Sequence, residues 1–300
     1  MAQVLISAAH KSSGKTTISL GLCAALTEDG SRVSPFKKGP DYIDPMWLAM
    51  ATGRPCYNLD FNTLTKEEIL ELFTRHQANT DLSLIEGNKG LYDGLDLDGS
   101  NSNAALAKLL KAPVILVIDA QGMTRGIAPL VLGYQAFDPD IQIAGVILNK
   151  LGGSRHEAKL RAVIEHYTNV PVIGAVHKDQ RLHLLERHLG LVPSNEDSEA
   201  QAHIKNIATA IREQVDLHRV QDIAKQVSRL NAQVASKPST QRLSPDVRIA
   251  IARDPAFGFY YPDDLEAFAN AGAVLVPFNT LSDKKLPDAD ALFIGGGFPE

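Results

Sequence analysis

The segment from residue 4 to residue 26 restricts the fold more than any other part of the chain. An apolar run, Val4-Leu5-Ile6, leads into the loop Ala8-Ala-His-Lys-Ser-Ser-Gly-Lys-Thr-Thr17, and a helical apolar pattern follows from Ile18 to Leu26. In this order of strand, loop and helix, backbone N–H groups and the positive helix end cradle phosphate groups. The segment therefore predicts a P-loop that binds ATP or GTP.

The loop supplies the first candidate site residues. Lys15 is placed to reach the terminal phosphates, and the Thr16 hydroxyl is placed to bind Mg²⁺. The first glycine of the usual loop pattern is replaced by Ala9, which adopts a positive φ less readily. The residues expected to contact the nucleotide are Ser12, Ser13, Gly14, Lys15, Thr16 and Thr17.

Apolar β-branched runs alternate with helical patterns along the first 235 residues, which is typical of βαβ units around a buried parallel sheet. The expected strands are 4–6, 82–85, 114–118, 143–148 and 170–173. The expected helices are 66–76, 103–111, 156–167, 198–216 and 220–235. The sequence thus predicts an α/β domain of the P-loop NTPase type over residues 1–235, with helices flanking a parallel sheet.

A second domain is expected after a short linker. Residues 236–245 are rich in Ser and Pro without an apolar period, which indicates a linker. Residues 246–300 contain strand patterns at 247–252, 273–277 and 291–294 and a helix pattern at 262–271. These 55 or so residues are too few for a complete covered sheet, so we expect the chain to stop inside this domain.

Charge and cysteine content exclude several kinds of partner. The net charge is −5 and no basic stripe is present, which argues against a nucleic-acid partner. Cys23 and Cys56 are the only cysteines, so a disulfide framework is not expected, and Cys23 falls in an apolar helical run that favours burial. No apolar stretch reaches the ~18 residues of a membrane span, and no targeting segment precedes the first strand. A soluble cytoplasmic protein with no membrane partner is expected.

Acidic residues gather where the strands of such a sheet end. Glu86 follows the run Leu82-Ser-Leu-Ile beside Gly87, at the sheet edge where ligands bind in open α/β folds. It is a candidate Mg²⁺ ligand. The segment Lys37-Lys-Gly-Pro-Asp-Tyr-Ile-Asp-Pro45 joins two lysines to Asp41 and Asp44, and its prolines restrict the backbone around both carboxylates. Asp93 follows on a glycine-flanked loop.

Longer motifs carry a resemblance to a known family. The segments that carry it are 39–45, 51–55, 58–60, 86–94, 107–110, 144–149 and 186–193, and in the tail Asp254-Pro-Ala-Phe257, Phe259-Tyr-Tyr261 and Gly295-Gly-Gly-Phe-Pro-Glu300. Together they closely resemble the cobyrinic acid a,c-diamide synthase family over nearly the whole chain. The tail resembles the start of that family's class I glutamine amidotransferase domain.

The resemblance implies ATP-dependent amidation of peripheral carboxylates on an anionic tetrapyrrole, with nitrogen from glutamine or ammonia. A carboxylate would be phosphorylated with ATP–Mg²⁺ and ammonia would attack the acyl phosphate. Lys15 would stabilise the transferred phosphoryl group, and Thr16, Asp41 and Glu86 would bind Mg²⁺. Asp44 and Asp93 would position substrate or ammonia, and Asn149 would recognise adenine.

Two departures from the family pattern keep alternatives open. Asn88-Lys89 replaces a usual Val-Met pair, and an extended polar turn, Asp96 to Asn103, follows. A sirohaem- or sirohydrochlorin-type amidase of the same family is therefore one alternative. The amidotransferase nucleophile is expected beyond residue 300, so glutaminase activity should be absent from these residues. A homodimer is possible on this reading.

Two more distant classes share the P-loop. Dethiobiotin synthetase also activates a carboxyl group, but residues 246–300 argue against it. A partition-type ATPase carries a lysine five positions before the P-loop lysine, where this chain has His10.

Overall fold

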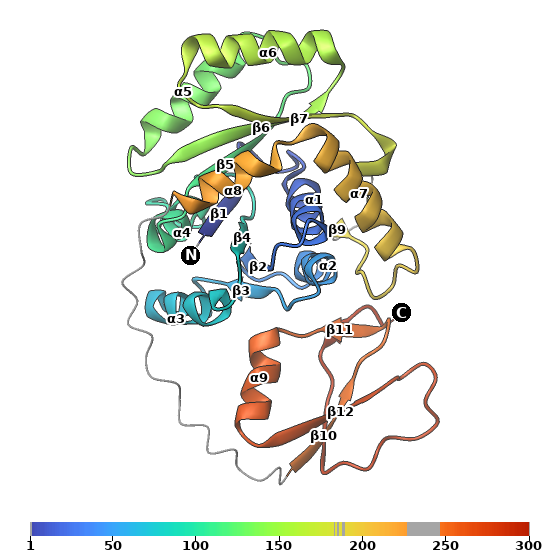
Figure 1. Cartoon of the computed structure of the whole chain (residues 1–300). Helices are drawn as coiled ribbons and strands as arrows, with labels where there is room; N and C mark the ends of the chain where they lie inside the picture. Colours follow the sequence, from blue (N-terminus) through green and yellow to red (C-terminus); the bar gives the residue numbers. More distant parts are fainter. Residues whose placement is uncertain (1, 183, 185, 188–189, 227–246, 300) are drawn as a thin grey trace.

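The computed structural model describes residues 2–182, 184, 186–187, 190–226 and 247–299. Within these ranges the chain forms a large α/β unit and a smaller unit that follows it (Figure 1). The expected linker, 236–245, lies outside the described residues, as does the end of the helix expected over 220–235.

A seven-stranded sheet is the frame of the large unit, and every neighbouring pair of strands is parallel. The spatial order is β3-β2-β4-β1-β5-β6-β7. The strands are β1 (Ala2–Ala8), β2 (Val33–Lys38), β3 (Tyr57–Leu59), β4 (Leu82–Glu86), β5 (Val114–Asp119), β6 (Ile143–Leu151) and β7 (Val172–His177). This order places β1 at the centre, so the loop that follows it lies where the strand order reverses, the usual ligand-binding position in such sheets.

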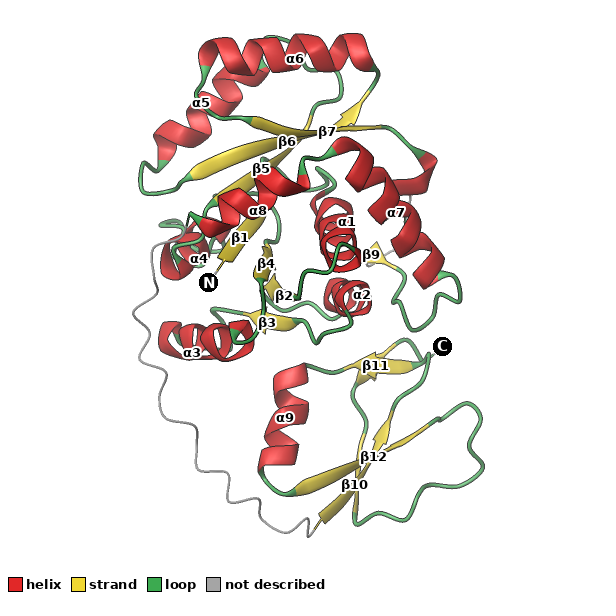
Figure 2. Cartoon of the chain, viewed as in Figure 1, coloured by secondary structure: helices red, strands yellow, loops and turns green. Residues whose placement is uncertain are grey.

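Helices cover both faces of this sheet (Figure 2). One apolar core contains side chains of α1 (Lys15–Glu28), α2 (Ile43–Thr52), α7 (Ala200–Gln214) and α8 (Leu217–Lys225). The other contains side chains of α3 (Lys66–Gln77), α4 (Asn103–Leu110), α5 (Ile127–Phe137) and α6 (Ser154–Tyr167). Burial on both faces explains why a strand such as β5 is a continuous apolar run and does not alternate with polar residues.

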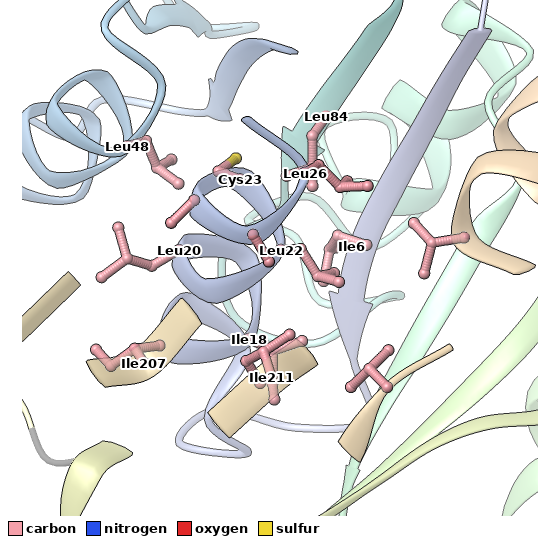
Figure 3. Packing of buried hydrophobic residues seen from close by; sticks show 14 of the residues in the cluster. Ile6, Ile18, Leu20, Leu22, Cys23, Leu26, Leu48, Leu84, Ile207 and Ile211 are labelled. Carbon is pink, nitrogen blue, oxygen red and sulfur yellow. The ribbon is translucent and has the colours of Figure 1, made fainter. Parts of the chain in front are cut away.

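Helix α1 is buried more completely than the sequence pattern alone required. Nine consecutive residues, Ile18–Leu26, are buried, because β1 and β4 lie on one side and α2 and α7 on the other (Figure 3). Gly21 allows the close approach of α7, since a Cβ there would overlap Cγ1 of Ile211. A helix that is apolar all round is expected only in such a position.

The smaller unit has a three-stranded parallel sheet in the order β12-β10-β13 and an antiparallel pair. Its elements are β10 (Val247–Ala252), β11 (Phe257–Phe259), α9 (Pro262–Asn270), β12 (Ala273–Phe278), β13 (Ala291–Phe293) and β14 (Gly296–Gly297). The remaining elements of the chain are a 3₁₀ turn, Gln180–Leu182, and a short hairpin of β8 (Glu186–Arg187) and β9 (Gly190–Leu191).

The two units touch through aromatic and polar contacts. The Tyr42 ring stacks on Tyr261 with centroids 4.4 Å apart and on Phe259 at 5.4 Å. Asn195 Nδ2 donates to the Asp254 carbonyl at 2.9 Å, and the Tyr57 hydroxyl donates to Glu266. Tyr42 directly precedes α2, so this contact lies beside the acidic segment 41–44.

The expected architecture is confirmed, with corrections at individual elements. The strand expected at 170–173 is β7, which runs from Val172 to His177. The sequence reading missed β2, β3, α2 and α5. Segment 37–45 is therefore not one loop, because Lys37 and Lys38 end β2 and Asp44 lies in the first turn of α2.

No helix within the described ranges combines enough length with enough apolar character to cross a membrane.

Candidate functional site

The carboxyl ends of three neighbouring strands bring the candidate residues together. β4 lies between β1 and β2, and Glu86 pairs with Ile6 of one and Lys37 of the other. The P-loop follows β1 directly. Because parallel strands end at one edge of a sheet, the loop, Lys37 and Glu86 must meet there.

The P-loop is fixed by hydrogen bonds within itself and to β6. Ser13 Oγ donates to the His10 carbonyl at 2.7 Å, and Asn149 Nδ2 donates to the Ser13 carbonyl at 2.8 Å. Gly14 has a φ of 86°, and a Cβ there would overlap Asn149, so glycine is required at this position. The other positive φ of the loop belongs to Ser12, at 65°. Ala9 needs no positive φ and fits without strain.

Two lysines and two carboxylates form a buried charge cluster at the start of α1. Glu86 Oε1 lies 3.1 Å from Lys15 Nζ and 3.1 Å from Lys37 Nζ, and it accepts a hydrogen bond from Thr16 Oγ1 at 2.7 Å. Lys37 Nζ also lies 2.5 Å from Asp44 Oδ2. Glu86 is fully buried and the Lys37 side chain is only 2% exposed. Charges at this depth persist only when they are paired, and here each is.

Asp41 and Asp44 occupy the N-terminal end of α2 in different roles. Asp41 Oδ1 accepts hydrogen bonds from the backbone N–H groups of Ile43 and Asp44, at 3.0 and 3.1 Å, while its Oδ2 lies 3.5 Å from Lys37 Nζ. Asp44 Oδ2 accepts from Thr16 Oγ1 at 3.3 Å. Asp44, rather than Asp41, is thus the aspartate that contacts the P-loop threonine.

Burial and charge shift the pKa values of the cluster in different directions. Burial raises the pKa of Asp41 to about 6, because Lys37 offsets it only in part. Burial also disfavours ionised Asp44, but the ammonium group of Lys37 outweighs this and holds the pKa of Asp44 below its usual value. Burial by itself would lower the pKa of Lys37; its three carboxylate neighbours instead raise it well above the usual value. Lys37 is therefore a permanent cation of the site.

One oxygen of the cluster lacks a partner. Glu86 Oε2 is buried and accepts no hydrogen bond from any residue that the structure describes, although Oε1 of the same group has three neighbours. Such an atom is costly to bury unless something else binds it.

Among the described residues, no group of three or more His, Cys, Asp or Glu side chains could hold a metal ion by itself. Mg²⁺, however, is usually held by one or two carboxylates together with phosphates and water. The Thr16 hydroxyl and the unpartnered Glu86 oxygen fit that requirement.

Two of the candidate residues lie outside the charge cluster. Asp93 is exposed, and its Oδ2 accepts from the backbone N–H of Gly90 at 2.9 Å, so it shapes the loop after β4. Asn149 is buried at the end of β6 and contacts the P-loop backbone. Adenine recognition by Asn149 stays a prediction.

Sequence reasoning missed several residues that build the site. Lys150 Nζ donates to the Ser12 carbonyl and pairs with Asp119 Oδ2, both at 2.8 Å, which ties the ends of β5 and β6 to the P-loop. Asn103 is fully buried and holds the turn that follows Glu86. Asp119 ends the apolar run of β5, and Lys150 lies two residues after the apolar run 143–148 of β6, so both positions could have been predicted at the sheet edge. Nothing in the local sequence marks Asn103 as buried.

Known relatives match the chain over nearly all its length. A cobyrinate a,c-diamide synthase from Magnetococcus marinus is 45% identical over 99% of this chain and 65% of its own length. The same name is carried by a relative from Methanosarcina acetivorans (45% identical, 99% of this chain, 62% of its own length) and by one from Listeria monocytogenes (43%, 100% and 66%). The chain thus spans 62 to 65% of the length of the first two.

Comparisons with solved structures and with protein-family models give a distant structural likeness and two family matches. Among solved structures, the signal recognition particle receptor FtsY from Elizabethkingia anophelis aligns over 69% of this chain and 65% of that chain with 14% identity and a TM-score of 0.45, a likeness too distant to indicate function. The CobB/CobQ-like glutamine amidotransferase domain matches residues 248–300. The CobQ/CobB/MinD/ParA nucleotide binding domain matches residues 5–192, which include the P-loop, Asp41, Asp44 and Glu86. With that match across more than half its length, the chain belongs to the CobQ/CobB/MinD/ParA nucleotide binding domain family.

Proposed function

We propose that this chain catalyses the ATP-dependent amidation of peripheral carboxylates on a tetrapyrrole, as the name of its curated relatives suggests. The observation that carries the proposal is the buried cluster in which Lys15, Thr16 and Lys37 meet Glu86, with one Glu86 oxygen left without a partner. A P-loop alone would serve any nucleotide hydrolase. Lys37, the extra cation, and the carboxylates of Asp41 and Asp44 supply what carboxyl activation needs: charge for both phosphate and substrate.

The first step joins ATP to the substrate carboxylate. A carboxylate oxygen attacks the γ-phosphorus, the bond to the β,γ-bridging oxygen breaks, and ADP leaves with that electron pair. Both reactants are anions, so their approach is opposed by charge. Lys15 and the P-loop N–H groups offset the charge on the phosphoryl group, and Lys37 offsets the charge on the carboxylate. Mg²⁺, held by Thr16 and Glu86 with Asp41 nearby, would neutralise phosphate charge when bound.

The second step forms the C–N bond. Ammonia attacks the carbonyl carbon of the acyl phosphate, inorganic phosphate leaves, and the nitrogen loses a proton. Asp44 is held as a carboxylate by Lys37, so it can orient ammonia or accept a hydrogen bond from it. Asp93 lies on the loop after β4 and would contact the substrate from that side.

We assign residues 1–235 to carboxyl activation and residues 246–300 to an amidotransferase-like unit, with 236–245 between them. The match of residues 248–300 to a glutamine amidotransferase domain supports this division and argues against a dethiobiotin synthetase-like function. Glutamine would then be the nitrogen source of the whole protein.

Product analysis tests the proposal directly. The full chain would be incubated with cobyrinate, ATP, MgCl₂ and ammonium chloride, and the products separated and weighed by mass spectrometry. We expect conversion of carboxylate to amide together with one ADP per amide formed. ATP hydrolysis that is independent of any tetrapyrrole, with no amide product, would contradict the proposal.

A parallel reaction with sirohydrochlorin addresses the second candidate substrate. Asn88 and Lys89, which replace an apolar pair in the related family, lie beside the site and favour testing this macrocycle as well. Faster amidation of sirohydrochlorin than of cobyrinate would assign the chain to that substrate.

A further inference from the structure

A second lysine lies beside the charge cluster without a counter-ion. Lys38 ends β2, directly after Lys37, and is only 8% exposed. Lys37 has three carboxylates within 3.5 Å, whereas the ammonium group of Lys38 makes no ion pair or hydrogen bond anywhere in the part of the chain that the structure describes. Successive residues of a strand point to opposite faces, so Lys38 cannot share the partners of Lys37.

The electrostatic surroundings of Lys38 are those of a cation that awaits an anion. Burial lowers its pKa, and the positive charge of Lys89 adds to that effect, while Asp60 opposes it. Asp60 lies too far away to pair with it, and its Oδ1 accepts hydrogen bonds from Asn62. A buried ammonium without a partner is costly, and a bound anion would remove that cost.

Lys89 is presented toward this region by a fixed turn. Asn103 accepts a hydrogen bond from the Asn88 N–H at 3.1 Å and donates to the carbonyls of Asn88 and Gly90. Lys89, between them, has a φ of 42°, a left-handed conformation that a lysine adopts only where its surroundings impose it. Its side chain is exposed and, within the described ranges, makes no ion pair.

The turn also lies directly over the end of β2. Gly39 follows Lys38, and a Cβ on Gly39 would be 3.0 Å from Asn88 Nδ2. The two lysines therefore flank one region beside the carboxylate-activating cluster, on the face of β2 opposite to Lys37.

We propose that Lys38 and Lys89 together form a binding site for a carboxylate of the substrate other than the one being activated. The substrate class is then a polycarboxylate, in which one carboxylate is held between the two ammonium groups while another reaches Lys37 and the P-loop. The inference rests on the proposed function for the identity of the second carboxylate. A two-point attachment of this kind selects which side chain of a macrocycle is activated.

Equilibrium binding of cobyrinate is the first test. We would compare the wild-type chain with Lys38→Met, Lys89→Met and Lys38→Arg, and with Lys159→Met as the matched control, since Lys159 is an exposed lysine of α6. Each methionine variant at the site should weaken cobyrinate binding about tenfold or more, because a charged hydrogen bond is lost. Lys38→Arg should stay within about threefold, Lys159→Met should equal wild type, and ATP affinity should change less than twofold in all of them. Weakened ATP binding in Lys38→Met with unchanged cobyrinate binding would overturn the proposal.

A second measurement tests the anion site of Lys38 and Lys89 independently of the proposed amidation of a tetrapyrrole. Acylation of individual lysines by an N-hydroxysuccinimide ester would be followed by mass spectrometry at saturating ADP, with and without propane-1,2,3-tricarboxylate. The tricarboxylate should slow acylation of Lys38 and Lys89 and leave Lys159 unaffected. If the tricarboxylate protects Lys38 and Lys89 from acylation but the chain does not bind cobyrinate, the anion site stands and the tetrapyrrole substrate is refuted. If the tricarboxylate gives no protection and the variants bind cobyrinate as the wild type does, the anion site is refuted.

Discussion

Lys15 is the residue with the most direct chemical role in the proposed reaction. Its ammonium group lies at the start of α1, 3.1 Å from Glu86, where the terminal phosphates of a bound nucleotide must lie. Lys15→Ala should reduce ATP turnover by about 10³-fold, since it removes charge that stabilises the transferring phosphoryl group. Steady-state ADP release in the presence of substrate measures this.

Circular dichroism provides the control for Lys15→Ala. The side chain is largely buried, but Glu86 keeps Lys37 as a partner, so the fold should survive. Substrate-dependent ATP turnover that persists near the wild-type rate, with an unchanged spectrum, would disprove this role of Lys15.

Glu86 and Asp41 should differ in their effects on the metal requirement. Glu86→Gln removes the carboxylate that contacts Thr16 and offers the unpartnered oxygen, so the Mg²⁺ concentration for half-maximal ATP turnover should rise at least tenfold. Asp41→Asn keeps an oxygen that can cap α2, and it should impair amidation with a smaller effect on Mg²⁺. The measurement is a Mg²⁺ titration of ADP release for each variant. An unchanged Mg²⁺ requirement and amidation rate in both would mean that neither carboxylate serves the reaction.

At the scale of elements, the contact between α1 and α7 is the one that fixes the P-loop helix. Gly21→Val should destabilise the protein by about 1–3 kcal/mol, because the added side chain would overlap Ile211 in a core without spare volume. Thermal unfolding followed by circular dichroism would report a lower Tm.

Gly133→Ala is the matched control for that substitution. Gly133 lies in α5, is exposed, has no positive φ and has nothing within 4 Å of an added Cβ. Alanine should raise stability by about 0.5–1 kcal/mol through helix propensity. A Tm for Gly21→Val equal to that of Gly133→Ala would show that α7 moves away at no cost.

At the scale of the whole molecule, the nitrogen source separates the two units. The 300 residues contain two cysteines, Cys23 and Cys56, and both are buried in the large unit with pKa values that burial raises. Neither can serve as a thiolate nucleophile toward glutamine. The chain of 300 residues should therefore amidate its substrate with ammonium chloride and not with glutamine.

Parallel reactions with the two nitrogen donors, at the same ATP and Mg²⁺ concentrations, measure this. A preparation shown to contain no glutaminase from the expression host is the necessary control. Equal product from glutamine would mean that another residue releases ammonia and that the division between the units is wrong.

The local pattern of residues was enough to predict the central frame of this protein. The strand, P-loop and helix at 4–26, the apolar strands and the position of Glu86 at a strand end all follow from short-range periodicity and from the rule that parallel strands share an edge. The second α/β unit followed from the strand patterns beyond residue 246. Element ends were less exact, as at β7, because helix and strand limits depend on neighbours in space.

Only the tertiary structure decided what the charged segment 37–45 is. β2 carries Pro35 and two lysines, which single-sequence reasoning reads as a loop, yet all six of its residues are buried between β3 and β4. Lys37 is tolerated there because Asp41 and Asp44, from the segment that directly follows β2, and Glu86, from the end of β4, surround it. Lys38, the next residue of β2, points to the opposite face of the sheet and does not reach the carboxylates that pair with Lys37. Asp93 lies at the surface. Pairing between residues distant in sequence is set by the sheet order, and no local pattern contains it.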